Sequence, residues 1–200
     1  MFLIFIFCLF VHSAAVDPFI VGGSFVQDPQ QYPFFASVER DGRHVCGGSF
    51  LSRDVVLTAA HCVSFINATQ EFTVVNSQQR STVLRIVHHH GHRRLPSGIL
   101  SDDIAFLVLD QPFSTARPIA AASDDSAVLE GLILGWGSSK NLSSAVIPIK
   151  TNAECVASLI LDGVNTTIDE IAGCVCAYAP GIDACQGDSG GPLSTQSGTA

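Results

Sequence analysis

The chain has 200 residues, of which 47% are hydrophobic, and a formal net charge of −8 from 18 acidic and 10 basic side chains. Nucleic-acid-binding surfaces are basic, so this balance argues against a nucleic-acid partner and favours cationic partners or substrates. The stretch from Ile20 to Ala200 is long enough to bury a sizeable core in one or two compact units.

The chain opens with an uninterrupted apolar run, MFLIFIFCLFV, which leads to the small residues Ala14 and Ala15. The run is too short to span a bilayer and lacks a basic residue, which leaves the amino terminus as its positive charge. We expect residues 1–15 to be a secretory signal peptide; the alternative is a buried N-terminal helix. No later segment is apolar enough for a membrane helix, so we expect no membrane partner and an extracellular location.

An extracellular location bears on the cysteines and on three glycosylation sequons. Disulfides are the expected state of the six cysteines beyond the signal peptide, which are Cys46, Cys62, Cys155, Cys174, Cys176 and Cys185. A metal or redox site at Cys174 and Cys176 is a less favoured alternative in a secreted chain. The sequons predict glycosylation of Asn67, Asn141 and Asn165, although each triplet also suits an ordinary polar loop.

Short β-rich runs separated by Gly, Pro, Asp, Ser or Asn dominate the remaining sequence. The predicted strands are Phe34–Glu39, His44–Leu51, Val55–Thr58, Glu71–Val75, Val83–Val87, Ile104–Leu109, Ala127–Leu134 and Ala145–Lys150. Helical patterns are limited to one turn at Ala59–Val63 and a short helix at Ala153–Leu161, capped by Asn152. This pattern predicts an all-β sandwich or barrel, with a boundary near Gln111–Pro118.

Three residues with the chemistry of acyl transfer follow one another in chain order. His61 lies in Thr-Ala-Ala-His-Cys, Asp103 opens the buried strand Asp-Ile-Ala-Phe-Leu, and Ser189 lies in Gly-Asp-Ser-Gly-Gly. A serine hydroxyl is a poor nucleophile until a base takes its proton, and an imidazole with an unperturbed pKa near 6.5 is such a base. Glycines allow a tight turn whose N–H groups stabilise an oxyanion. Taken singly, each feature also suits a structural role.

These motifs, with Ile20-Val-Gly-Gly and Gly135-Trp136-Gly137, resemble those of the chymotrypsin-like serine proteases, the trypsin family, from Ile20 to the end of the chain. The resemblance implies an all-β fold of two Greek-key six-stranded β-barrels. The peptidase domain would span residues 20–200, with the first barrel at about 20–118 and the second at about 119–200. The second barrel would lack its C-terminal part.

The resemblance also implies catalytic roles. His61 would be the general base, Asp103 would orient it, Ser189 would be the nucleophile, and the N–H groups of Gly187 and Ser189 would form the oxyanion hole. Of two adjacent acids, Asp103 matches the family motif, in which Asp is followed by Ile-Ala. Asp102 is then expected to be an exposed neighbour.

Activation and specificity follow from the same resemblance. Residues 16–19 would form a short propeptide, and cleavage before Ile20 would free an amine that pairs with Asp188. The residue before the cut is Phe19 rather than Arg or Lys, so an activating protease that cuts after an aromatic residue is expected. Asp183 would form the floor of the substrate-binding pocket and attract Arg or Lys; an exposed loop acid is the alternative.

The family pattern implies disulfides between Cys46 and Cys62 and between Cys155 and Cys176. In the family, Cys185 bonds a cysteine beyond the point where this chain stops, and Cys174 has no counterpart. A bond between Cys174 and Cys185 remains open, because sequence does not settle connectivity.

Neither a cofactor nor a metal is predicted. The histidines of the run His88-His89-His90-Gly91-His92 could bind zinc or copper, but a solvated loop is preferred because no acid or cysteine completes the site nearby. The family's calcium loop, expected at about 67–80, carries only Glu71, whereas calcium needs several oxygen ligands.

The predicted function is a secreted serine endopeptidase that cuts after Arg or Lys through an acyl-enzyme. Its expected partners are protein or peptide substrates, protein inhibitors and an activating protease. Family members continue for several tens of residues beyond the position of Ala200, and this part supplies the opposite wall of the substrate pocket. A non-catalytic homologue, or an inactive truncated product that acts by binding, is therefore the alternative, and a fragment of a full-length enzyme is the interpretation we favour.

Overall fold

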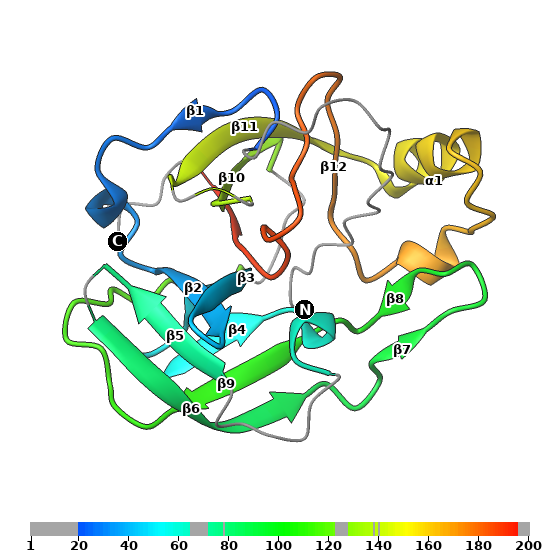
Figure 1. Ribbon diagram of the computed structural model, residues 1–200. Coiled ribbons are helices and arrows are strands. Elements are labelled where there is room, and N and C mark those ends of the chain that lie inside the picture. Colours follow the sequence, from blue (N-terminus) through cyan, green and yellow to red (C-terminus); the bar gives the residue numbers. More distant parts are fainter. Residues whose placement is uncertain are drawn as a thin grey trace.

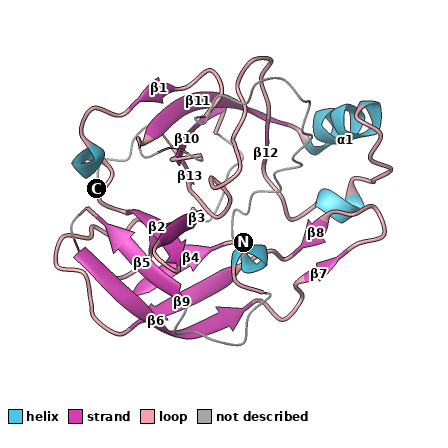
Figure 2. Cartoon of the chain, viewed as in Figure 1, coloured by secondary structure: helices cyan, strands magenta, loops and turns pink. Residues whose placement is uncertain are grey.

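The computed structural model describes residues 20–64, 72–77, 79–122, 128–137, 139 and 141–195. The predictions for residues 1–19, and for the sequon at Asn67, lie outside these ranges. Two β-layers stack on one another, with few helical segments around them (Figures 1 and 2). None of the helices in the described ranges is long and apolar enough to cross a membrane.

The lower layer in Figure 1 is a closed antiparallel barrel. Its strands, in order around the barrel, are β2 (Phe35–Arg40), β3 (Arg43–Phe50), β4 (Val55–Thr58), β9 (Ala105–Leu109), β6 (Gln79–His88) and β5 (Phe72–Asn76). Alternate side chains of β5 and β9 point inward, as the period of a strand requires. Asp41 and Gly42 have positive φ angles of 52° and 72°, which suits the two-residue turn joining β2 and β3.

The upper layer is an open sheet. Its main path is β1 (Ser24–Phe25), β11 (Ser143–Lys150), β10 (Glu130–Gly135) and β13 (Leu193–Ser194), and β12 (Cys176–Ala177) pairs with β11. All of these pairs are antiparallel. The fold is therefore the all-β fold that was predicted, with one closed six-stranded barrel. Because β1 pairs with β11, the first residues of the region expected for the first barrel belong to the upper layer.

A separate apolar cluster joins the layers, in which Phe34 and Phe35 are buried with Leu134 and Leu142. The hairpin of β7 (Arg93–Arg94) and β8 (Leu100–Ser101) extends from the barrel at one side. The helix α1 (Asn152–Leu161) lies beside the upper layer.

The helix begins one residue before the predicted start, because Thr151 is its N-cap rather than Asn152. Thr151 and Glu154 form a capping box, in which each side chain accepts the other residue's backbone N–H.

Candidate active site

The pairing of β4 with β9 brings His61 and Asp103 together. Thr58 lies opposite Ala105, so the single 3-10 turn Ala60–Cys62 that follows β4 lies beside Asp103, two residues before β9. Asp103 Oδ1 accepts the backbone N–H of His61 at 2.7 Å, and Asp103 Oδ2 lies 2.5 Å from His61 Nδ1. Because a carboxylate only accepts, His61 donates from Nδ1 and leaves Nε2 as an acceptor.

The His61 partner determines the charge of Asp103, which is only 3% exposed. Burial by itself raises the pKa of the Asp103 carboxyl, but the hydrogen bonds and charge of His61, with a smaller contribution from His92, hold that pKa below its usual value. Asp103 is therefore ionised at neutral pH.

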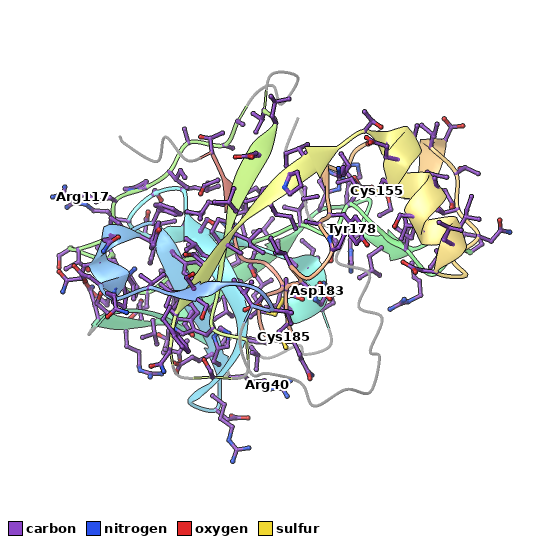
Figure 3. The ribbon with its side chains drawn as sticks, turned by 90° about the horizontal axis from the view of Figure 1, so that it is seen from above. Arg40, Arg117, Cys155, Tyr178, Asp183 and Cys185 are labelled. Atoms are coloured by element: carbon purple, nitrogen blue, oxygen red, sulfur yellow. A yellow bond between two sulfur atoms is a disulfide. The ribbon has the colours of Figure 1, made fainter. Side chains whose placement is uncertain are left out.

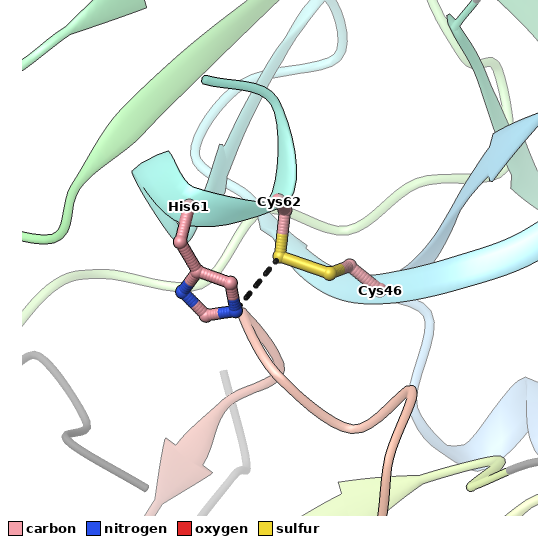
Figure 4. Close-up of side chains that lie close together, drawn as sticks. All are labelled: Cys46, His61 and Cys62. Atoms are coloured by element: carbon pink, nitrogen blue, oxygen red, sulfur yellow. Dashed lines mark hydrogen bonds between the residues drawn. A yellow bond between two sulfur atoms is a disulfide. The ribbon is translucent and has the colours of Figure 1, made fainter. Parts of the chain in front are cut away.

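The disulfide between Cys46 and Cys62 links the histidine turn to β3. Cys62 Sγ lies 3.8 Å from His61 Nε2 (Figure 4). It also lies 3.8 Å from the carbonyl oxygen of Ser189. The backbone N–H of Gly47 donates to the same carbonyl at 2.8 Å. The backbone of Ser189 thus lies against β3 and the disulfide that follows His61. The nearby Cys46, His61 and Cys62 are not a metal site, because the disulfide consumes both thiols.

The Ser189 loop depends on glycines for its shape. Gly187 has a φ of +101° and Gly190 a φ of +77°, which L side chains rarely adopt. A Cβ on Gly190 would lie 2.3 Å from Thr58 Oγ1 and 2.7 Å from the carbonyl oxygen of Gly47. Within the described ranges, the N–H groups of Gly187 and Ser189 have no protein acceptor.

The buried carboxylate of Asp188 holds the Ser189 loop through hydrogen bonds to backbone N–H groups. Asp188 is 4% exposed, and its carboxylate accepts the N–H of Gly137 at 2.6 Å and that of Cys185 at 2.7 Å. A Cβ on Gly135 would lie 1.9 Å from Asp188 Oδ1, so only glycine fits there. Burial raises the pKa of Asp188, although these two hydrogen bonds and the charge of His44 oppose the rise.

His44, which the sequence did not single out, also supports the loop. Its Nε2 lies 2.9 Å from the carbonyl oxygen of Gly187, and its Nδ1 lies 2.7 Å from Ser37 Oγ. The carbonyl requires an N–H donor, so Nδ1 accepts the Ser37 hydroxyl. Trp136 packs edge-on against the ring, and burial lowers the pKa of His44. No local pattern marks His44, because burial does not alternate along β3 and the Gly187 carbonyl that it contacts lies 143 residues further along the chain.

The segment after Phe19 lies on the loop that contains Asp183. Ile20 is 2% exposed, and Val21 exchanges both backbone hydrogen bonds with Asp183 at 2.9 and 3.2 Å. The Asp183 side chain itself is exposed, and partial burial raises its pKa. Asp188 makes no hydrogen bond to Ile20 among the bonds of the described ranges.

The second disulfide joins Cys155 in α1 to Cys176 in β12. Both disulfides are those that the family resemblance implied, and Cys174 and Cys185 take part in neither. In Figure 3, Asp183 and Cys185 lie near each other in projection, whereas Cys155 and Tyr178 lie toward α1. Asn141 and Asn165 are exposed, and their glycosylation remains a prediction.

The histidine run does not converge on one point. His89 and His90 stack at 4.6 Å, His89 Nδ1 lies 3.6 Å from Asp102 Oδ1, and His92 turns toward Asp103. Across the described ranges, no three ligand atoms of this run cluster. Asp102 is half-buried rather than exposed, because it contacts His89 and accepts the Ser101 hydroxyl at 2.9 Å.

The fold and the site define the class of this protein. A closed β-barrel supplies a His–Asp pair, and a glycine-shaped loop whose Ser189 carbonyl contacts Cys62 approaches the histidine turn, which fits the architecture of a chymotrypsin-like serine protease.

The chain belongs to the trypsin family, whose sequence model matches residues 20–200. It is 32% identical over 195 residues to hypodermin-B of Hypoderma lineatum, covering 89% of this chain and 73% of that protein. It is 32% identical to hypodermin-A of the same species over 194 residues, covering 88% and 73%. It is 31% identical to trypsin alpha of Drosophila melanogaster over 193 residues, covering 89% and 73%.

Proposed function

We propose that this protein is a secreted serine endopeptidase in which His61, Asp103 and Ser189 form the catalytic triad. The observation that supports this proposal best is the paired hydrogen bonding of His61 and Asp103 beside the Ser189 loop. Protein or peptide chains are the substrates.

In the proposed reaction, Asp103 fixes the ring of His61 so that Nε2 accepts the Ser189 hydroxyl proton. Ser189 Oγ then attacks the scissile carbonyl carbon, and the N–H groups of Gly187 and Ser189 stabilise the oxyanion that forms. His61 returns the proton to the leaving amine, which breaks the peptide bond and leaves an acyl-enzyme. Water, deprotonated by His61, hydrolyses the ester and regenerates Ser189.

We propose cleavage after Arg or Lys, with Asp183 as the residue that recognises the cation. Asp183 is held by backbone bonds to Val21, and its exposed carboxylate is free to receive a basic side chain. We further propose that cleavage between Phe19 and Ile20 activates the protein and that protein inhibitors bind the same site.

The test is active-site labelling of secreted protein whose N-terminus has been confirmed as Ile20 by Edman sequencing. A fluorophosphonate should label the wild type, should not label Ser189→Ala, and should label Asp103→Asn slowly. Peptide substrates with Arg or Lys before the scissile bond should be cut faster than a matched peptide with Phe at that position. Asp183→Ser should remove this preference. A folded wild-type protein without labelling would instead favour the non-catalytic, binding homologue.

A further inference from the structure

A second imidazole faces the carboxylate of Asp103. His92 lies in the turn after β6, where its N–H donates to the carbonyl oxygen of His89 at 3.1 Å. Its ring Nδ1 lies 3.6 Å from Asp103 Oδ1. The side chain is 17% exposed, yet Nδ1 is buried and has no hydrogen-bond partner among the described residues. A buried polar atom without a partner is costly, so this placement needs a reason.

The carboxylate has room for another donor. A carboxylate oxygen offers two lone pairs, and Asp103 Oδ1 receives the backbone N–H of His61 while Oδ2 faces His61 Nδ1. Among the described residues, the charged or titratable groups that contact Asp103 are His61 and His92, whereas His89 lies against Asp102. A shortening of the 3.6 Å separation by about 0.6 Å would give an ordinary N–H···O bond, and catalytic hydrogen bonds often tighten only when substrate binds.

We propose that His92 is a positioning residue, which donates its Nδ1–H to Asp103 Oδ1 and holds the carboxylate in line with His61. This inference rests on the proposed protease function, because the carboxylate that His92 holds is the one that orients the general base. His92 touches neither the substrate nor the reacting atoms.

The proposal fixes the direction of a pH effect. A hydrogen-bond donor on Oδ1 draws negative charge away from Oδ2, the oxygen that faces His61, and so disfavours the protonated form of His61. A protonated His92 would disfavour protonated His61 more strongly. Without His92, the acid limb of kcat/KM should therefore move to higher pH. The carboxylate should also be held less firmly, which should lower kcat about tenfold and change KM less than twofold.

The sharpest comparison is between His92→Asn and His92→Leu. Asn Nδ2 occupies the position of His Nδ1 and keeps a hydrogen-bond donor. Leu has almost the same shape as Asn but offers no donor. Asn should restore kcat to within threefold of the wild type, and Leu should not. His90→Asn, on an exposed neighbour, is the control for general changes in the loop and should leave the rate and its pH profile unchanged.

A second readout needs no turnover. The proton between His61 Nδ1 and Asp103 should give a downfield NMR signal in wild type and His92→Asn, and that signal should be shifted or broadened in His92→Leu. Identical signals and pH profiles in all three proteins, at equal thermal stability, would overturn the role of His92. Failure of the wild type to hydrolyse any peptide or to label Ser189, with the downfield signal still dependent on His92, would instead contradict the protease function alone.

Discussion

Replacement of His44 by Leu tests whether this ring holds the Ser189 loop. The substitution removes the donor to the Gly187 carbonyl and the acceptor of the Ser37 hydroxyl, and Ser37 is itself only 7% exposed. Each partner left unsatisfied costs about 1–3 kcal/mol, so we expect a loss of about 3 kcal/mol in the free energy of unfolding. For a domain of this size, that loss lowers Tm by about 6–12 °C.

Urea denaturation and calorimetry measure this loss, and a double-mutant cycle isolates its cause. Ser37→Ala with His44→Leu should cost less than the sum of the single changes, because the hydroxyl that loses its partner is absent. His44→Gln, whose amide can still donate to Gly187, should recover part of the loss. A change below about 0.5 kcal/mol for His44→Leu, or strict additivity in the cycle, would refute the supporting role.

The pH dependence of stability gives His44 a further signature. Burial lowers the pKa of His44 in the folded state, whereas the unfolded imidazole takes up its proton near pH 6.5. The unfolded state therefore binds more protons just below that pH, so acidification favours unfolding. Between pH 6.5 and 5, the wild type should lose more stability than His44→Gln; equal losses in urea titrations would contradict this.

Two other changes probe the frame around the site. Gly135→Ala should destabilise the fold by about 3 kcal/mol or more, since its Cβ would overlap Asp188 Oδ1. Gly173→Ala is a matched control, because nothing lies within 4 Å of its Cβ position. Similar Tm values for the two variants would contradict the expected clash. Removal of the Cys155–Cys176 disulfide, with both residues changed to Ala, should cost about 3 kcal/mol for its separation of 21 residues, and an unchanged urea midpoint would exclude that contribution.

Strong local patterns could be predicted from the sequence, and contacts between distant segments could not. The strand at Val55–Thr58 matches the prediction, because its apolar run is bounded by polar residues. The two-residue strands β1, β7, β8, β12 and β13 were missed, since so short a segment has no period to detect.

Among the site residues, sequence spacing placed Asp103 at the mouth of a buried strand, where the structure has it. It did not place His92 against that carboxylate, because the turn after His89 directs the ring. Asp102 was expected to be exposed, but its contact with His89 half-buries it.

The two buried carboxylates differ in the kind of partner each one has. Asp103 has the imidazole of His61, and its pKa is lowered despite burial. Asp188 accepts two backbone N–H groups, and these bonds, together with the charge of His44, do not outweigh burial, so its pKa stays raised. Asp188 thus sits in a site that favours the arrival of a positive charge. Cleavage before Ile20 would release an amine, which carries such a charge. Under the proposed activation, this cleavage would therefore change the environment of the Asp188 carboxylate and not that of Asp103.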